Sequence, residues 1–176
     1  LTIVNGENIA ENGKGITEKL YKWLLNQGVD VVTLGNHAWD NRDIYEFIDS
    51  ANCLVRPVNL PKTTPGKGVH YVKINQEEVA IINALGSVFM GPCIDPFQVL
   101  PDVIAEVRKR TPHILLDMHA ETTSEKQATG WLFDGQVSAV LGTHTHVQTN
   151  DARILPKGTA YMSDVGMTGA LNSIIG

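Results

Sequence analysis

Residues 137–146 have the sequence VSAVLGTHTH, an apolar run that stops at a glycine and is followed by two histidines. An apolar run bounded by glycine predicts a buried strand that ends in a loop. Strand side chains alternate between two faces, so His144 and His146 would converge on one site if their backbone were extended. This stretch therefore predicts half of a metal site at the end of a strand.

Three other stretches share this design, in which an apolar strand ends in side chains that can bind metal or transfer protons. They are residues 4–8 (VNGEN), 34–40 (LGNHAWD) and 116–121 (LDMHAE). In open α/β sheets, ligands bind in the crevice at the carboxyl ends of the strands. We therefore expect the four loops to meet at one point, although they are far apart in the chain.

Helical segments between the apolar strands predict an α/β fold. We expect strands at 1–5, 29–34, 114–118, 137–141 and 160–163, an antiparallel hairpin at 69–74 and 79–84, and helices at 17–27, 41–48, 101–110 and 124–133. The first strand, helix and second strand form a β-loop-α-β unit, which favours parallel pairing with a right-handed crossover. We expect one domain over residues 1–176, long enough to bury a full core.

The composition is typical of a globular protein, with 43% hydrophobic and 19% charged residues. The net charge of −5 gives no broad electrostatic footprint for nucleic acid. No apolar stretch approaches the roughly 20 residues that cross a bilayer, and no signal peptide is visible, so we expect a cytoplasmic protein without membrane contact. Cys53 and Cys93 are expected to be reduced.

The candidate ligands combine imidazole, carboxylate and amide groups without a thiolate, which suits Mn, Fe or Zn. They are Glu7, Asn36, His119, His144 and His146. Five or six ligands are too many for one tetrahedral ion and suit two ions about 4 Å apart, bridged by a carboxylate. Such a pair can bind a phosphate and activate a bridging water for an in-line displacement.

His37 is adjacent to the expected ligand Asn36 and is not needed to complete the metal site. An imidazole in this position can protonate a leaving alkoxide. Asp40 or Asn41 is expected to cap the helix at 41–48, and for Asp40 this role is preferred to that of a catalytic acid. Together these residues predict hydrolysis of a phosphate ester.

Several polar and aromatic residues have two interpretations each. Asn8 could face a metal ion or only stabilise a turn. Asp117 could orient a ligand histidine from behind or face solvent, and Asp164 is a further candidate for such support. Trp39 and Trp131 could stack on a base, although core packing is the preferred interpretation.

Five stretches of the chain resemble the YmdB family of calcineurin-like metallophosphoesterases. They are residues 5–8 (NGEN), 35–40 (GNHAWD), 117–121 (DMHAE), 142–149 (GTHTHVQT) and 154–161 (ILPKGTAY). The resemblance extends over essentially the whole chain. It implies a sandwich of two mixed β-sheets flanked by helices, a binuclear metal centre and phosphodiesterase activity toward 2′,3′-cyclic nucleotides.

The resemblance also implies a role for each residue of the site. Glu7 is similar to the bridging carboxylate of the family, and Asn8 to a ligand beside it. His146 is similar to a ligand of one ion, and His37 to the catalytic acid. The residues similar to ligands of the other ion are Asn36, His119 and His144.

The chain differs from the family pattern at its ends. The family begins with a strand that carries a Gly-Asp motif whose aspartate binds metal, and nothing before Leu1 supplies it. The family also continues past the position of Gly176. We therefore expect a domain that is incomplete at both ends and lacks its first strand.

The sequence thus predicts a metal-dependent phosphodiesterase that hydrolyses 2′,3′-cyclic nucleotides or cyclic-phosphate RNA ends. A metal-bridging hydroxide would attack phosphorus while His37 protonates the departing ribose oxygen. Two divalent transition-metal ions are implied, with Fe or Mn favoured over Zn, and self-association is a tendency of the family. One alternative is a regulatory module that holds a nucleotide or RNA in the metal cleft without turnover. Another is a hydrolase for a different phosphomonoester or diester.

Overall fold

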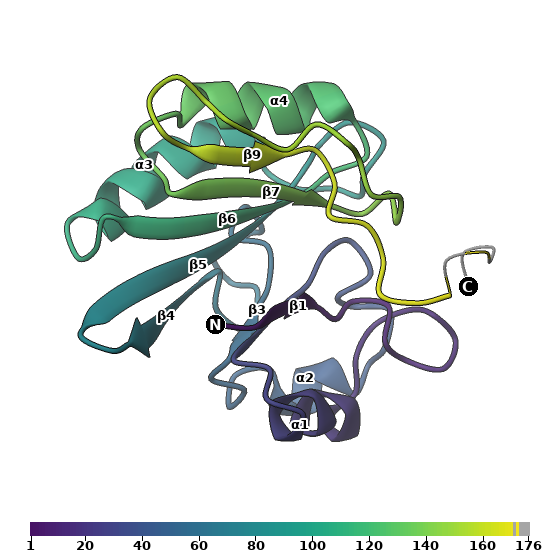
Figure 1. Ribbon diagram of the computed structural model, residues 1–176. Coiled ribbons are helices and arrows are strands. Elements are labelled where there is room, and N and C mark those ends of the chain that lie inside the picture. Colours follow the sequence, from purple (N-terminus) through teal and green to yellow (C-terminus); the bar gives the residue numbers. More distant parts are fainter. Residues whose placement is uncertain (171, 173–176) are drawn as a thin grey trace.

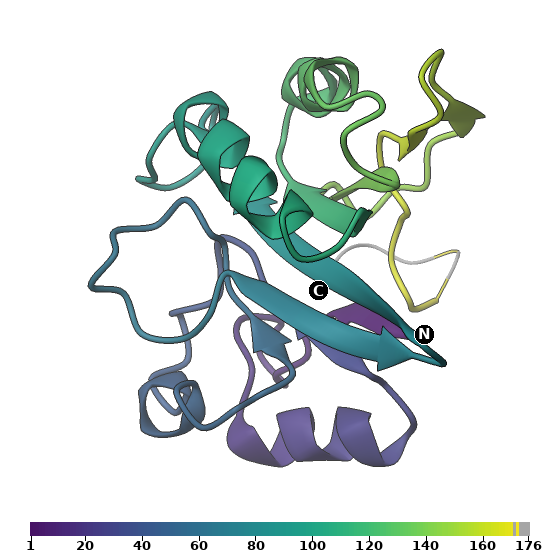
Figure 2. The ribbon, with the colours of Figure 1, turned by 90° about the vertical axis from the view of Figure 1, so that its left-hand side faces the viewer.

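Two β-sheets lie face to face, and helices cover their outer faces, in a computed structural model that describes residues 1–170 and 172 (Figure 1). The smaller sheet has the order β1-β2-β3 and the larger sheet β4-β5-β6-β7-β9-β8. Figure 2 shows the four layers from the side, with helices at the outer surfaces and the sheets between them. Gly176, past which the family is expected to continue, lies outside the described residues.

The smaller sheet is built from short parallel strands whose connections are helical. Its strands are β1 (Ile3–Asn5), β2 (Val31–Thr33) and β3 (Leu54–Val55), and its helices are α1 (Glu18–Asn26) and α2 (Ile44–Phe47). All pairs in this sheet are parallel, which confirms the predicted β-loop-α-β unit. Thr17 caps α1, because its Oγ1 accepts a hydrogen bond from the N–H of Leu20 at 3.3 Å.

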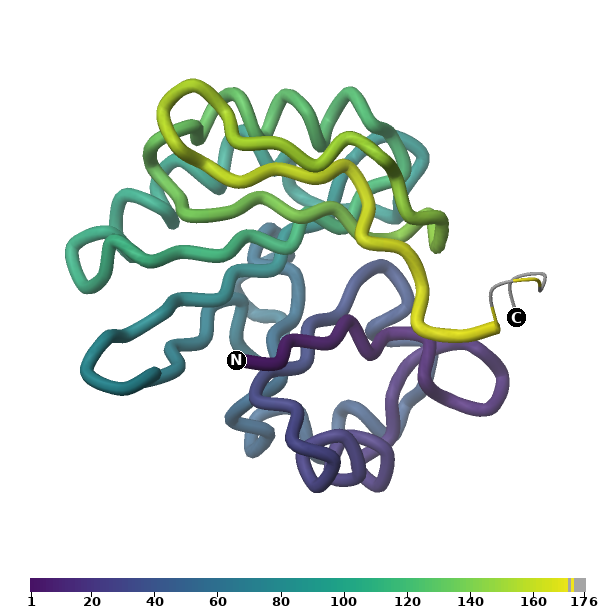
Figure 3. The backbone as a smooth tube through the Cα atoms, viewed as in Figure 1, coloured from purple at the N-terminus to yellow at the C-terminus, as the bar shows by residue number. Residues whose placement is uncertain are grey.

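The larger sheet is mixed, since antiparallel edge pairs flank a parallel centre. Its strands are β4 (Val69–Ile74), β5 (Glu77–Leu85), β6 (His113–His119), β7 (Ala139–Thr143), β8 (Arg153–Ile154) and β9 (Ala160–Met162). Helices α3 (Pro96–Arg108) and α4 (Thr123–Leu132) cover its outer face. The tube in Figure 3 shows the chain after β9 running from this sheet down to the level of the smaller sheet.

Apolar side chains form three cores, one under each helical layer and one between the sheets. Adjacent strand residues point to opposite faces. Val32 therefore packs under α1 and α2, whereas Val31 faces the larger sheet. In the same way Ile82 packs under α3 and α4 while Ile81 faces the smaller sheet. Burial on both faces explains why these strands are continuous apolar runs in the sequence.

Several predicted boundaries were wrong. The helix expected at 41–48 is a single turn at Ile44–Phe47, so Asp40 does not cap it. The helix expected to start at Pro101 begins at Pro96, where Asp95 caps it and a proline suits the first turn. Helix α4 is capped by Thr122, not by a serine. Strands β3 and β8 were not predicted.

The remaining predictions about the chain concern membranes and thiols. Within residues 1–170 and 172, none of the helices has the length and apolar character that crossing a membrane requires. Both cysteines, Cys53 and Cys93, are free thiols.

Candidate metal centre

The candidate ligands follow the carboxyl ends of four strands that belong to two different sheets. Glu7 follows β1 and Asn36 follows β2, so both come from the smaller sheet. His119 is the last residue of β6, and His144 directly follows β7, so both come from the larger sheet. As predicted from the sequence, the two sheets bring these four side chains together at one edge.

Three polar atoms lie within hydrogen-bond distance of the Nε2 atom of His119. Glu7 Oε1 and Asn36 Oδ1 each lie 2.9 Å from His119 Nε2. His144 Nδ1 lies 3.2 Å from the same atom. Ligand atoms of Glu7, His119 and His144 all lie within 4.8 Å of one another.

The hydrogen-bond partners of the two rings leave lone pairs, not protons, at the centre of this cluster. Thr143 donates its only hydroxyl proton to Asp117 Oδ1 at 2.6 Å, so it accepts a bond from His119 Nδ1 at 2.9 Å. His144 Nε2 lies 3.0 Å from Glu121 Oε2, which places its proton there. In both neutral rings the inward nitrogen is then an acceptor.

A buried carboxylate oxygen without a donor points to the same conclusion. Glu7 is 1% exposed, and its Oε1 accepts no hydrogen bond although it lies beside His119. Burying an anion without a partner is very unfavourable, and a cation at the centre of the four lone pairs would satisfy all of them. The donor set of one carboxylate, one amide oxygen and two imidazoles fits a divalent transition metal.

The charges of the cluster suit this arrangement. Burial raises the pKa of Glu7, but nearby His119 and the N–H group of His37 lower it by more, so its pKa lies below the ordinary value. Burial is the largest effect on the pKa of His144 and lowers it below the ordinary value. Glu7 is therefore ionised and His144 neutral near pH 7, which are the forms that bind metal.

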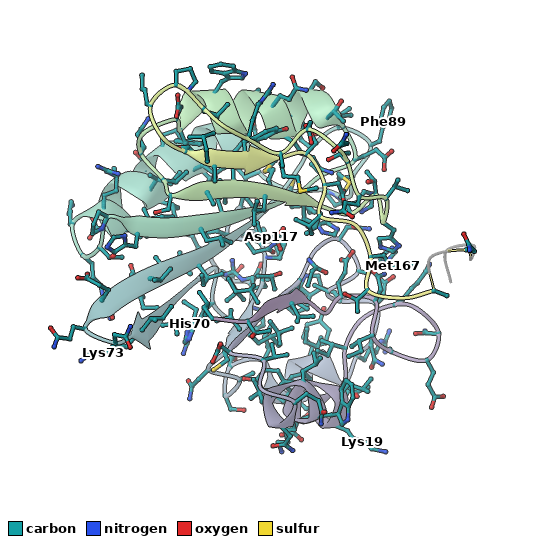
Figure 4. The ribbon with its side chains drawn as sticks, viewed as in Figure 1. Lys19, His70, Lys73, Phe89, Asp117 and Met167 are labelled. Carbon is teal, nitrogen blue, oxygen red and sulfur yellow. The ribbon has the colours of Figure 1, made fainter. Side chains whose placement is uncertain are left out.

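Asp117 lies at the centre of the molecule, between the two sheets (Figure 4). It is buried, so the alternative that it faces solvent is wrong. It accepts hydrogen bonds from the hydroxyl groups of Thr33 and Thr143 and from the amides of Asn5 and Asn83. Burial raises the pKa of Asp117 by more than His119, Thr143, Thr33 and Asn5 lower it, so its pKa lies above the ordinary value. Asp117 reaches His119 through Thr143, not directly.

Asn8 and His146 form a second polar contact beside the first cluster. His146 Nε2 lies 3.2 Å from Asn8 Oδ1, while Asn8 Nδ2 donates to Gly13 O at 2.8 Å. Asn8 therefore both stabilises its loop and points its oxygen toward the site. His146 Nδ1 is buried and makes no hydrogen bond, so this ring nitrogen also lacks a partner.

The two histidines do not converge by strand alternation, as the sequence had suggested. Strand β7 ends at Thr143, and His144 and His146 both have positive φ angles, of 102° and 62°. Non-glycine residues with positive φ are uncommon and strained. The extended-backbone premise was therefore wrong, although both side chains do line one pocket.

This pocket has a volume of about 560 Å³ and contains the expected catalytic residue. His37 lines it, donates its backbone N–H to Glu7 Oε2 at 2.9 Å, and places Nδ1 2.8 Å from Asp40 Oδ2. Asp40 thus binds His37 and does not cap a helix, which corrects the sequence interpretation. Lys14 and Glu121 also line the pocket.

Sequence reasoning did not identify three residues that support the site. Glu121 binds His144, and its position two residues after His119 could have indicated it. Thr143 became visible only through the strand register, which pairs it with His119. Lys126 forms a buried ion pair with Asp164 at 2.8 Å, and no local pattern marks it.

Trp39 and Trp131 do not line this pocket. Trp39 packs partly on the core under α1 and α2, and its ring centroid lies 5.2 Å from that of Tyr45. Trp131 is 53% exposed beside Arg153, so the expectation of core packing was wrong for this residue. Neither observation supports a role in base stacking at the site.

Comparison with known proteins identifies relatives over the whole chain. A sequence profile of the family described as "YmdB-like protein" matches residues 1–176. A relative from Bacillus subtilis named 2′,3′-cyclic-nucleotide 2′-phosphodiesterase is 58% identical over 175 residues, which cover 99% of this chain and 66% of the relative. The chain therefore spans slightly less than two thirds of that relative's length.

Solved structures share the fold. The crystal structure of a novel phosphatase from Mycoplasma pneumoniae has a TM-score of 0.86 at 40% identity, over 95% of this chain and 60% of that one. A 5′-nucleotidase precursor from Thermus thermophilus has a TM-score of 0.60 at 16% identity, over 81% of this chain and 34% of that one. The second likeness shows the fold alone. The predicted two-sheet sandwich of the calcineurin-like type is confirmed, although the described smaller sheet is entirely parallel.

Proposed function

Because this chain belongs to the YmdB-like protein family, we propose that it is a metal-dependent phosphodiesterase. Its substrates would be 2′,3′-cyclic nucleotides or RNA ends that carry a 2′,3′-cyclic phosphate. The Bacillus subtilis relative is named for the 2′-phosphodiesterase activity, and this chain is 58% identical to it. The pocket of about 560 Å³ at the strand ends has room for such a nucleotide.

The observation that carries this proposal is the convergence of four lone pairs beside the buried Glu7 carboxylate. In our proposal Glu7, Asn36, His119 and His144 hold one ion, while Asn8 and His146 contribute with Glu7 to a second. Mn, Fe and Zn all suit these ligands. Divalent ions would polarise a phosphoryl oxygen, lower the pKa of a water molecule and stabilise the charge of an in-line displacement.

His37 is the proposed general acid. Its Nδ1 is held by Asp40 at 2.8 Å, and its backbone is held by Glu7, so the ring is fixed on the pocket wall. In the protonated ring Nδ1 donates to Asp40, and Nε2 carries the second proton, which passes to the ribose 2′-oxygen as the phosphorus–oxygen bond breaks. General acids of this kind contribute roughly 10²–10⁴ in rate.

Lys14 is the proposed electrostatic guide for the substrate. Of the described residues that line the pocket, it carries the one side chain with a fixed positive charge. The long side chain is exposed and can reach a phosphate or the backbone of an RNA end. A local cation is consistent with phosphate binding by a chain whose net charge is −5.

The decisive experiment measures metal content and product together. The purified chain is loaded with Mn²⁺, dialysed and analysed for metal, then incubated with 2′,3′-cyclic AMP while phosphorus NMR follows the product. We expect bound metal and a 3′-phosphomonoester, and His119→Ala should lose both.

Two outcomes would contradict the proposal. A chain that binds 2′,3′-cyclic AMP and metal but yields no product would be a binding module without turnover. A chain that hydrolyses other phosphate esters faster than any cyclic nucleotide would be a hydrolase with a different substrate.

A further inference from the structure

A buried ion pair lies behind the loop that carries His144 and His146. Lys126 on α4 donates from Nζ to Asp164 Oδ2, which follows β9, at 2.8 Å. Both side chains are only 1% exposed, and neither lines the pocket. Desolvation of two charges often cancels their attraction, so a buried pair is weak evidence for a role in stability. A role other than stability is therefore needed to explain why this ion pair is buried.

Asp164 binds the residue between the two histidines. Its Oδ2 accepts hydrogen bonds from the backbone N–H of Thr145 at 3.1 Å and from the hydroxyl of Thr145 at 2.8 Å. Its own backbone N–H donates to Thr149 Oγ1 at 2.9 Å, and its carbonyl accepts from the N–H of Thr149 at 3.1 Å. One residue thus fixes both ends of segment 145–149.

The loop that Asp164 fixes has a strained backbone. His144 and His146 both adopt positive φ angles, on either side of Thr145. Such conformations persist when the surrounding structure holds them. The two bonds from Thr145 to Asp164 are placed to supply this restraint for both histidines at once.

Lys126 packs beside the segment of chain that leads to Asp164. A Cβ atom on Gly142 would lie 1.7 Å from the carbonyl oxygen of Ser163 and 2.8 Å from Lys126 Cδ. The end of β7, the chain before Asp164 and the aliphatic stem of Lys126 are therefore in direct contact. Helix α4 is thereby linked to the loop through one charged side chain.

We propose that the Lys126–Asp164 pair positions His144 and His146 together, so that both parts of the metal centre form as one unit. This inference rests on the proposed metal centre. His144 belongs to the cluster with Glu7 and His119, and His146 to the contact with Asn8. Loss of the pair should therefore weaken all metal binding at once. Removal of the Glu121 carboxylate should affect only His144, to which it is bonded.

The test compares metal affinity with folding in matched variants. Mn²⁺ binding is measured by calorimetry, and unfolding of the metal-free chain by circular dichroism. Asp164→Asn should lower the affinity at least tenfold for all bound metal, because supporting partners of metal ligands typically contribute 10–100-fold. Thr145→Val should lower it less, since the backbone bond remains, and Thr145→Ser should restore it.

Asp134→Asn is the matched control. Asp134 is also a buried carboxylate, 5% exposed, and accepts backbone hydrogen bonds from Lys157 and Thr159 at 2.9 and 3.3 Å. It makes none of the contacts that Asp164 makes to the loop that carries His144 and His146. We expect this variant to lose stability without losing metal affinity.

The double variant Lys126→Met with Asp164→Leu separates positioning from folding, since an apolar pair can replace a buried ion pair without loss of stability. It should fold and still bind metal weakly. Wild-type affinity in folded Asp164→Asn or in the double variant would overturn the inference while leaving the metal centre intact. Equal loss of affinity in Asp134→Asn would also overturn it, because stability alone would then explain the effect. A wild-type chain without metal would overturn the metal centre itself and this inference with it.

Discussion

Thr143 Oγ1 lies 2.9 Å from His119 Nδ1, and the two residues are paired in register on the parallel strands β7 and β6. Because Thr143 gives its proton to Asp117, it accepts one from His119 and so fixes the ring with its Nε2 lone pair toward the site. This relation determines which nitrogen of His119 is available to a metal ion.

Thr143→Val should therefore weaken metal binding by about 10–100-fold. The variant leaves the His119 Nδ1 proton and an Asp117 oxygen without a partner, which costs roughly 1–3 kcal/mol of stability. Thr33→Val is the matched control, since Thr33 also donates to Asp117 at 2.6 Å but does not touch His119. Equal metal affinities in the two variants, measured by calorimetry, would contradict the role of Thr143 in fixing the His119 ring.

Loss of the proposed acid should leave metal binding intact. His37→Ala is expected to retain its metal and to lose about 10²–10⁴ in turnover of a cyclic nucleotide. An ester with a nitrophenolate leaving group needs no proton, so its hydrolysis should change little. Asp40→Asn should give a smaller loss, because it weakens only the support of Nδ1. A similar loss with both substrates would show that His37 does not act as an acid.

Glycine is required at position 35 for space and not for backbone freedom. A Cβ atom there would lie 2.3 Å from His119 Nε2 and 2.4 Å from Glu7 Oε2. Gly35→Ala should displace both side chains, lower stability by about 1–3 kcal/mol and abolish tight metal binding. Gly91→Ala is the control, since no atom would lie within 4 Å of its Cβ. If folded Gly35→Ala binds metal with wild-type affinity in a titration, this expectation is wrong.

Asp164 should make the stability of the metal-free chain depend on pH. Burial raises its pKa, but Lys126 and its backbone and hydroxyl donors lower it by more, so the folded pKa is depressed. A depressed pKa contributes stability above the unfolded value of about 3.9, and this contribution is lost as the pH falls through the folded value.

Urea unfolding of wild type and Asp164→Asn between about pH 5 and pH 3 tests this linkage. The difference in unfolding free energy between the two proteins should shrink as the pH falls. A difference that stays constant over this range would show that the Asp164 carboxylate has the same pKa in both states.

The layered fold was predictable because its strands are buried on both faces and end in glycine-bounded polar clusters. That pattern located β1, β2, β6 and β7, and strand ends in such sheets meet at one edge. Helix lengths were less predictable, since α2 forms only one turn and α3 begins before Pro101. Local signals such as caps and prolines fit more than one starting residue in these segments.

The candidate ligands were predictable for the same reason, whereas the residues that support them were not. Glu7, Asn36, His119 and His144 each lie at the end of a strand or just past it, so their meeting depends only on topology. The contacts of Thr143 with His119 and of Lys126 with Asp164 depend on register and on packing between distant segments. The turn at 144–146 also depends on tertiary contacts, because propensity alone disfavours positive φ at histidine.

The apolar contact between the two sheets is small compared with the cores beneath the helices, since its fully buried residues are Val31, Val55 and Ile81. Glu7 and Asn36 belong to one sheet and His119 and His144 to the other. An ion bound by all four would act as a cross-link between two halves of the molecule, each with its own core. Metal removal should then uncouple the halves, so that amide hydrogen exchange in β1–β3 becomes faster before the strands of the larger sheet respond.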